Sequence, residues 1–163
     1  WETANEMPWD VLLLFGGGLS LSAMFTATGL SLWIGEKAKG LASLPMILLI
    51  LAVAALVLIL TELTSNTATA ATFLPIMGGV AVGIGLTDAT EMNVMLLAIP
   101  VALAATCAFM LPVATPPNAI AYSSGYVTMG EMIKGGVWLN AIAMVLITLA
   151  TYFIAVPVFG LVL

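Results

Sequence analysis

The chain has 163 residues, of which 63% are hydrophobic and 7% are charged. About a quarter of the residues in a soluble domain carry charge, so this composition excludes a soluble core with a polar surface and predicts an integral membrane protein. Eight acids against three lysines give a net charge of −5, which excludes the basic patch that nucleic-acid binding needs. The chain has no histidine, and no nucleophile–base pair or metal-ligand cluster indicates an enzyme.

The first part of the chain predicts one membrane-spanning helix. "WETANEMP" has no basic region leading into an apolar one, so it is not a secretory signal peptide. The chain begins at Trp1 rather than at methionine, and we expect it to be a piece of a longer protein. Residues 10–34 are apolar and rich in glycine and serine, which favours a spanning helix that packs closely against others.

A polar segment, "TELTSNT", then separates two apolar runs, residues 46–60 and 68–86. The first run is short for a helix that crosses about 30 Å of hydrocarbon, and the second contains Pro75 and several glycines. Two interpretations remain open from these residues alone. Either both runs cross the membrane and the polar segment is a surface turn, or both are half-crossings of a re-entrant hairpin with "TSNT" at its tip.

A second polar break interrupts the next apolar run. Residues 94–111 are apolar, and "PVATPPN" follows with three prolines, which cannot continue a helix. We therefore expect a discontinuous helix over residues 91–126, with a long half, an extended stretch and a short half. Residues 133–163 predict a final spanning helix that bends near Pro157. The predicted fold is an all-α integral membrane protein with a re-entrant helical hairpin and a discontinuous transmembrane helix.

Such breaks have a chemical use. Non-helical backbone inside a membrane is tolerated where protein or a watery cavity satisfies it. Unwound backbone presents carbonyl oxygens that coordinate small cations, and the N-termini of half-helices attract anions. A hairpin tip that faces a broken helix therefore predicts a site for an anion together with a coupling cation.

The motifs themselves resemble those of a known family. "SNT", small residues and "FLPI", then "CAFMLPVATPPNAI" about 40 residues later, resemble the divalent anion/sodium symporter family. "LLLFGGGLSLS" upstream and "GEMIKGGVWLNAIA" downstream are similar to the same family, so the resemblance covers nearly the whole chain. Thr106 and Ala121 are conservative departures, because the family often has serine and valine there. Carriers of this family take up dicarboxylates and citrate, and relatives take up sulfate.

The resemblance implies a specific organisation. Family members have two inverted-topology repeats, each with its own "SNT" hairpin and broken helix, and this chain would be the C-terminal one. Residues 1–43 would be a scaffold helix with its connecting segment. Residues 44–163 would belong to the transport domain, with the hairpin at 44–86, the broken helix at 91–126 and the final helix at 133–163. The expected partners are the N-terminal repeat of the same protein, a second copy in a homodimer, the lipid bilayer and a small dianionic carboxylate.

The implied activity is sodium-coupled transport of succinate-like di- or tricarboxylates by alternating access, in a multi-pass protein of the cell membrane. The alternatives are a sodium-independent exchanger or sulfate carrier of the same fold, and a non-transporting membrane scaffold. The implied orientation puts Lys37 and Lys39 outside and Lys134 inside. That is the reverse of the usual positive-inside distribution, and we take the motifs as the stronger signal.

The resemblance also implies ligands. Na⁺ would be held by the hydroxyl of Thr61, the carbonyl of Thr64, the side chain of Asn66 and the carbonyl of Ala114. An alternative for the two threonines is that their hydroxyls bond back to carbonyls of their own helix. Glu62 is the one acid near the tip, and we interpret it as structural, bonded to neighbouring backbone, rather than as a proton or ion site.

The substrate carboxylate would meet Asn66 and Thr67 at the start of the second half-helix, where an anion is favoured. Ser65 would orient the tip, and Thr67 is alternatively only the N-cap of that helix. Thr115 and Pro116 would line the facing wall, with Asn118 capping the short half-helix. An alternative for Pro116 is a rigid break without ligand contact.

Overall fold

A computed structural model describes residues 44–86 and 92–162, together with isolated positions between 13 and 33. The helix expected over residues 10–34 therefore lies largely outside the described residues. The described part is helical and contains no strand: α5 (Met46–Leu63), α6 (Asn66–Gly83), a 3₁₀ turn η1 (Met92–Val94), α7 (Met95–Ala105), α8 (Pro116–Ser123), α9 (Met129–Ala150), a π-helical turn η2 (Thr151–Ala155) and α10 (Val156–Phe159).

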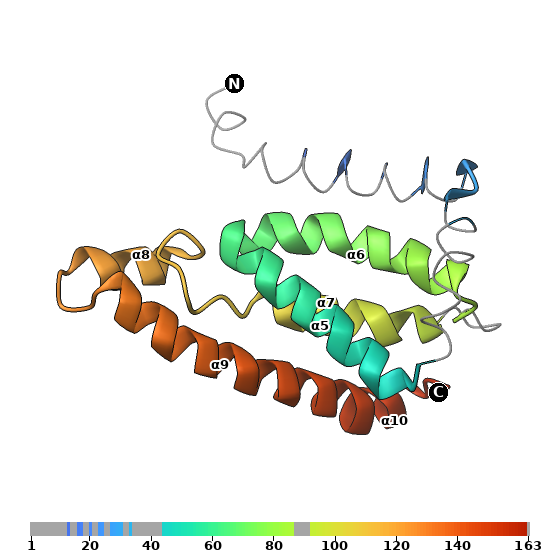
Figure 1. Cartoon of the computed structure of the whole chain (residues 1–163). Helices are drawn as coiled ribbons and strands as arrows, with labels where there is room; N and C mark the ends of the chain where they lie inside the picture. Colours follow the sequence, from blue (N-terminus) through green and yellow to red (C-terminus); the bar gives the residue numbers. More distant parts are fainter. Residues whose placement is uncertain are drawn as a thin grey trace.

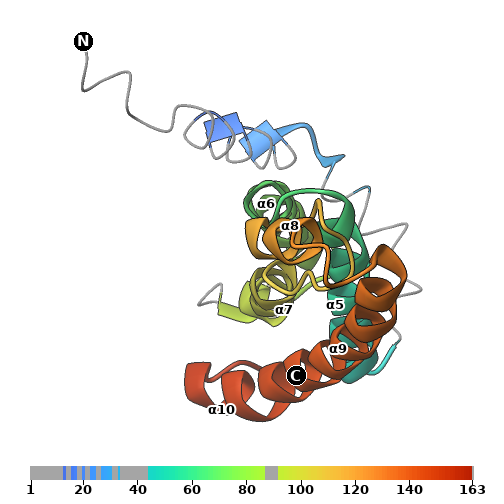
Figure 2. The same ribbon diagram turned by 90° about the vertical axis from the view of Figure 1, so that its left-hand side faces the viewer.

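The α5–α6 pair meets at one end, where only Thr64 and Ser65 separate the two helices. Figure 1 shows α5 and α6 running in opposite directions from this connection, which we call the hairpin tip. α7 packs against both helices of the pair, and α9 packs against α5. Figure 2, turned by 90°, agrees, with α9 on the side of α5 away from α6.

One stripe of α5 is buried from end to end. Its buried residues form adjacent pairs, and each pair begins four residues after the previous one. They are Leu49, Ile50, Val53, Ala54, Val57, Leu58, Thr61 and Glu62. This is the spacing of one helix face. Because α5 is apolar all round until its last turn, the pattern of apolar residues does not mark which face is inside. The stripe ends in the polar pair Thr61 and Glu62, so packing carries these two side chains into the interior.

α7 has a matching stripe that faces α5 and α6. Its buried residues are Leu96, Leu97, Pro100, Val101, Ala104 and Ala105. Four of them form one core cluster with five residues of the α5 stripe, with Met77 and Ala81 of α6, and with Ile147 of α9; the four are Leu97, Val101, Ala104 and Ala105, and the five are Leu49, Val53, Ala54, Val57 and Leu58.

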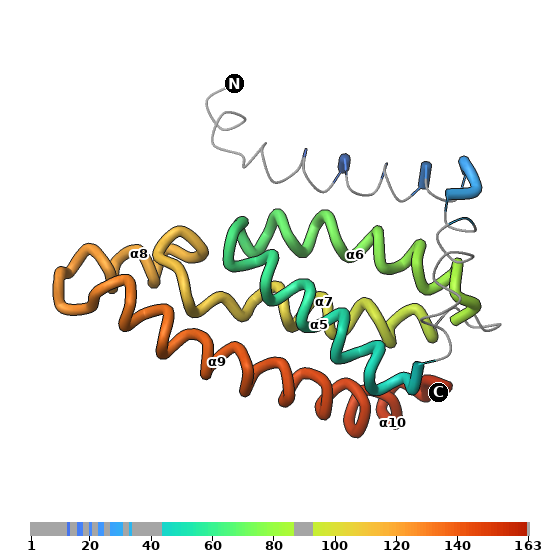
Figure 3. Tube along the Cα trace, in the orientation of Figure 1, coloured from blue at the N-terminus to red at the C-terminus, as the bar shows by residue number. Residues whose placement is uncertain are grey.

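The discontinuous helix is present, but it opens earlier than the sequence indicated. α7 ends at Ala105 and α8 begins at Pro116, so the unwound stretch is residues 106–115 rather than 112–118. The apolar letters of residues 106–111 continue a helical pattern, which is why the expectation was wrong. The backbone N–H groups of residues 109–111 are instead bound by a side chain of α5, as described below. Figure 3 shows the chain passing the hairpin tip between α7 and α8 without a helical coil.

The final helix also begins earlier than expected, at Met129 rather than near residue 133. Thr128 and Glu131 form a capping box, in which each side chain bonds the backbone N–H of the other residue. This motif starts a helix in a segment that looks polar enough for a loop. Near the other end, the π-helical turn ends at Ala155, two residues before Pro157, which lacks the N–H that a regular helix needs.

Two described helices are long and apolar enough to cross a membrane: Met46–Leu63, and the continuous unit Met129–Phe159 of 31 residues. The surface of α9 is largely apolar, and among the exposed side chains are Val137, Trp138, Ile142, Val145 and Leu146. Such a surface fits contact with lipid or with other membrane helices. The helical fold and its membrane character are therefore as the sequence predicts.

Gly136 lets α9 touch the unwound stretch. A methyl group in the place of its hydrogen would come within 2.5 Å of Phe109 O and 2.6 Å of Met110 Cα. Both are backbone atoms, so no side chain can move aside to make room. The neighbouring Gly135 has open space at the same position. The close approach of α9 to residues 109 and 110 therefore depends on one glycine.

We predict that Gly136→Ala lowers the melting temperature of the purified protein in detergent, because overpacking against backbone costs about 1–3 kcal/mol or more. Gly135→Ala is the matched control, and it should hold or raise the melting temperature, since alanine is favoured over glycine in a helix by about 1 kcal/mol. Equal melting temperatures for the two variants would contradict the close packing at Gly136.

Candidate functional site

The carboxylate of Glu62 binds three consecutive backbone N–H groups of the unwound stretch. Oε1 accepts from Phe109 N at 2.7 Å and from Met110 N at 2.9 Å. Oε2 accepts from Met110 N at 3.0 Å and from Leu111 N at 3.1 Å. Glu62 is 4% exposed. Successive N–H groups around one anion form a concave anion-binding nest, and here the anion is a side chain of the protein itself.

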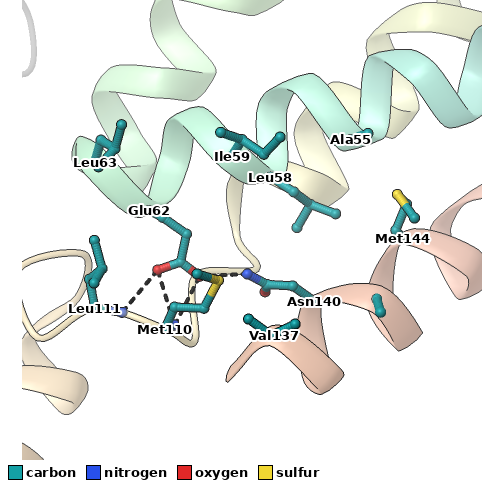
Figure 4. Close-up of a pocket in the computed structure, with 11 residues that line it drawn as sticks. Ala55, Leu58, Ile59, Glu62, Leu63, Met110, Leu111, Val137, Asn140 and Met144 are labelled. Carbon is teal, nitrogen blue, oxygen red and sulfur yellow. Dashed lines mark hydrogen bonds between the residues drawn. The ribbon is translucent and has the colours of Figure 1, made fainter. Parts of the chain in front are cut away.

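α9 adds a fourth donor to the same carboxylate. Asn140 Nδ2 donates to Glu62 Oε1 at 2.7 Å. Asn140 lies one helical turn after Gly136, so both sit on the face of α9 that meets the unwound stretch. Figure 4 shows Glu62 extending from α5 toward Met110, Leu111 and Asn140. These residues also line a mostly apolar cavity of about 290 Å³ between α5 and α9.

At the tip, Thr61 and Asn66 meet each other and the end of α7. Thr61 is fully buried, and its hydroxyl lies 2.8 Å from both Asn66 Oδ1 and Ala105 O. Asn66 Nδ2 lies 3.5 Å from Thr106 O. Three neutral oxygens, from the Thr61 and Asn66 side chains and from the Ala105 carbonyl, therefore converge where the tip touches the unwound stretch.

The other tip residues have mainly local roles. The Thr64 hydroxyl donates to Leu60 O at 3.1 Å, which is the bond to its own helix that the sequence left open, and it also contacts the Thr69 hydroxyl. Ser65 is the N-cap of α6, since its Oγ accepts from Ala68 N at 3.1 Å. The alternative that Thr67 caps this helix is therefore wrong. Thr67 is exposed and faces no hydrogen-bond partner among the described residues.

The facing wall is organised differently from the expectation. Thr115, not Asn118, is the N-cap of α8, because the Thr115 hydroxyl accepts from Asn118 N at 3.3 Å. The Asn118 side chain instead donates to Ala108 O at 2.9 Å and Leu111 O at 3.0 Å. It thus ties α8 to the unwound stretch. Pro116 is exposed at the first position of α8.

Ala114 is buried, and its N–H donates to Leu111 O at 3.2 Å. The hydrogen bonds that join the tip to the unwound stretch reach the carbonyls of Ala105 and Thr106 instead. The sequence did not single out these two carbonyls. Every residue has a backbone carbonyl, so the residue types at positions 105 and 106 do not indicate this role. Both residues also lie before the segment in which prolines predict a break of the helix.

Gly136 and Asn140 were also missed as parts of this region. A glycine and an amide in an apolar helix are weak signals alone, but their four-residue spacing places them on one helix face. An asparagine on the inner face of a membrane helix needs a partner, because lipid offers none. Because Asn140 needs a partner and Glu62 is the one acid near the tip, the sequence could have predicted that these two side chains bond each other.

The region as a whole combines two kinds of polar group. Neutral hydroxyl, amide and carbonyl oxygens suit a hard monovalent cation. The N-terminus of α6 at Ser65 and that of α8 at Thr115 are both capped by hydroxyls, and helix N-termini favour negative charge nearby. Four donors already bind the Glu62 carboxylate. The groups that remain for ligands are the neutral oxygens, which suit a cation, and the helix N-termini, which suit an anion.

Comparison with known proteins agrees with this chemistry. Residues 1–160 match the family described as the sodium:sulfate symporter transmembrane region. The chain is 47% identical over 161 residues to the sodium-dependent dicarboxylate transporter SdcS of Staphylococcus aureus strains MRSA252 and USA300. The match covers 99% of this chain and 30% of either relative, so the chain spans about a third of their length. The chain is a transmembrane protein that belongs to the sodium:sulfate symporter family.

Proposed function

We propose that this chain is the C-terminal repeat of a sodium-coupled dicarboxylate carrier and supplies one half of its ion and substrate site. The observation that carries the proposal is the contact between the hairpin tip and the unwound stretch, where Thr61 and Asn66 meet the carbonyls of Ala105 and Thr106. The N-terminus of α6 begins at this contact, and that of α8 begins at the far end of the unwound stretch. Coupled transport of Na⁺ and an anion requires oxygens that can bind a cation and, near them, helix N-termini that attract an anion.

The substrate class is proposed from the relatives. SdcS is named a sodium-dependent dicarboxylate transporter, and the shared sequence includes the tip and the unwound stretch. A dianion that enters a cell against 100 mV costs about 4.6 kcal/mol, from about 2.3 kcal/mol per charge. At least three Na⁺ per dianion are needed for the membrane potential to assist uptake, so we expect further Na⁺ ligands in the part of the protein outside this chain.

We infer that α5 and α6 form a re-entrant hairpin. Asn140 of α9 contacts Glu62 next to the tip, and it lies about 17 Å along α9 at about 1.5 Å per residue. The 31-residue unit α9–α10 is about 46 Å long by the same rise. If this unit is centred on a hydrocarbon core of about 30 Å, the tip lies inside the core, about a third of the way from the side where α9 begins.

The proposed Na⁺ ligands are the Thr61 hydroxyl, the Thr64 carbonyl, the Asn66 side chain and the Ala114 carbonyl. The contact between Thr61 and Asn66 supports the first and third. The bond of the Thr64 hydroxyl to its own helix leaves only its carbonyl for this role. The Ala105 carbonyl lies beside the same two side chains, so Ala105 is the backbone position we add to the proposal.

The proposed substrate ligands are Ser65, Asn66, Thr67, Thr115 and Pro116. Thr67 is exposed in the first turn of α6, where its hydroxyl is free to meet a carboxylate. Ser65 and Thr115 cap their helices with their hydroxyls. After Ser65 the first N–H groups of α6 can contribute, whereas Pro116 and Pro117 after Thr115 have no N–H. Pro116 shapes the wall at the first turn of α8.

The wider organisation is proposed on the same basis. Residues 44–163 belong to the moving transport domain, and residues 1–43 belong to the scaffold that supports a homodimer. A second hairpin and broken helix, outside this chain, complete the site. Because the family description also names sulfate, sulfate is the second candidate substrate, and the uptake experiments below include it.

We predict that Asn66→Ala, in the full-length protein that contains this chain, weakens Na⁺ and dicarboxylate affinity together. The Asn66 amide offers an acceptor oxygen to Na⁺ and donor hydrogens to a carboxylate, and losing a hydrogen bond to a charged group costs about 1.5–3 kcal/mol, roughly ten- to a hundredfold in affinity. Thr61→Ala should raise the Na⁺ requirement more than it changes succinate affinity at saturating Na⁺.

The measurement is radiolabelled succinate uptake over a grid of Na⁺ and succinate concentrations, with unlabelled sulfate as a competitor and surface expression checked. Ser123→Ala is a suitable control, because this exposed residue lies at the end of α8 away from the tip. Wild-type kinetics for Asn66→Ala across the grid would show that the polar segment is only a turn. Uptake that persists without Na⁺ would favour an exchanger.

A second prediction concerns the piece of protein itself. Residues 1–163 alone, reconstituted in liposomes, should not transport succinate, because half of the ligands and the opposing hairpin are missing. Saturable Na⁺-dependent uptake by this piece, measured against empty liposomes and the full-length protein, would contradict the two-repeat organisation.

A third prediction concerns depth. In a structure of the full-length protein in lipid nanodiscs, Asn66 should lie inside the hydrocarbon band, with both ends of the α5–α6 pair on the opposite side of the membrane from the start of α9. A tip at headgroup level, with α5 and α6 both crossing fully, would instead make the polar segment a surface turn.

A further inference from the structure

We propose that Glu62 is the positioning residue of this site: its carboxylate serves as a built-in anion that keeps residues 109–111 unwound and joins the hairpin, the unwound stretch and α9 into one unit that moves as a whole. The inference rests on the proposed transport function for its consequence in uptake. We call the meeting of these three segments the joint, and its existence is argued only from the contacts of Glu62, Gly136 and Asn140.

Every partner of the Glu62 carboxylate is a donor. Three are backbone N–H groups in a row, at 2.7 to 3.1 Å, and the fourth is the side-chain amide of Asn140 at 2.7 Å. Inside a membrane no water replaces a lost acceptor, so without Glu62 these N–H groups have two outcomes. They either stay unsatisfied, or residues 106–111 wind up and extend α7.

The position of Glu62 in the chain links this joint to the ion ligands. Its neighbour Thr61 is the residue whose hydroxyl meets Ala105 O at the start of the unwound stretch. Two adjacent residues of α5 therefore hold the same stretch at two points, Ala105 and residues 109–111. If that stretch winds up, the carbonyls of Ala105 and Thr106 turn into the helix and no longer face Thr61 and Asn66.

α9 is attached at the same place from the other side. Asn140 donates to Glu62, and Gly136 brings α9 into contact with the backbone of Phe109 and Met110. Three segments that are distant in sequence thus meet around one carboxylate. Sliding of α5 along the unwound stretch breaks several hydrogen bonds at once, and sliding of α9 breaks the Asn140 bond and the close packing at Gly136, so the three segments shift together.

The joint also narrows the choice of substrate ligands. The nest at residues 109–111 is concave and rich in N–H groups, and without Glu62 it would attract an anion. Because Glu62 fills it, these N–H groups do not bind the transported dicarboxylate. The donors for the substrate therefore come from the tip, through the Asn66 and Thr67 side chains and the first N–H groups of α6, and from the Thr115 hydroxyl, since Pro116 and Pro117 have no N–H.

The test is chemical rescue. Glu62→Ala in the full-length protein empties the nest, and formate is an anion small enough to refill it. The variant should melt several degrees below wild type in detergent, and its succinate uptake should fall by roughly ten- to a hundredfold. Added formate should raise both the melting temperature and the uptake of Glu62→Ala. Formamide, which is neutral and of similar size, should restore neither.

Two variants control the experiment. Glu131→Ala removes an exposed acid at the start of α9, which leaves no enclosed nest, so formate should not change it. Glu62→Gln keeps the size but turns amide hydrogens toward N–H donors, so it should melt below wild type and need more Na⁺. If Glu62→Ala fails to reach the membrane, Glu62→Gln becomes the deciding variant. A melting temperature and a Na⁺ dependence equal to those of wild type in Glu62→Gln would overturn the proposal.

Formate that leaves a membrane-inserted Glu62→Ala unchanged would likewise overturn the proposal. The melting experiment is independent of transport. If the wild-type protein takes up no dicarboxylate, the proposed function fails, while the response of the melting temperature to formate still decides whether Glu62 holds the joint.

Discussion

The arrangement of this protein depends on the bond between the Glu62 carboxylate and the N–H groups of residues 109–111. A membrane interior tolerates unwound backbone only where protein or a watery cavity satisfies it. Here one side chain satisfies three consecutive donors, and Asn140 completes its shell. The unwound stretch is thereby held open at low cost, and the carbonyls of Ala105 and Thr106 stay available at the hairpin tip.

The small residues around this bond make it geometrically possible. Gly136 has no side chain, so α9 can approach the backbone of Phe109 and Met110. Asn118 anchors the far side of the same stretch through the carbonyls of Ala108 and Leu111. The stretch is therefore fixed by α5, α8 and α9 together, although it has no regular structure of its own. Rigid support of irregular backbone is what a site for exchangeable ions needs, since its ligands must keep their geometry while the ion leaves.

The chemistry divides between permanent and exchangeable partners. The one buried acid among the described residues of the site, Glu62, is bound by fixed donors and is not free for a ligand. The groups that remain near the tip are neutral oxygens and helix N-termini. Neutral ligands bind Na⁺ weakly enough for release, and helix ends attract a carboxylate without a fixed positive charge. This division accounts for how a chain with three lysines and no arginine could contribute to the anion carrier that we propose.

The sequence by itself determined the membrane setting, the helical class, the family, and the two polar breaks, because apolar length, prolines and the "SNT" motif are local signals. It also marked Thr61 and Asn66, since polar residues stand out in apolar surroundings. Only the tertiary structure decided where the long half of the broken helix ends, which carbonyls face the tip, and which residues cap α6 and α8. Residues 106–111 have a helical apolar pattern, but the Glu62 side chain, 47 residues before Phe109 in the sequence, binds the N–H groups of residues 109–111 in place of helical carbonyls. A long-range hydrogen bond of this kind leaves no mark in the local sequence, and neither does the space that Gly136 leaves open.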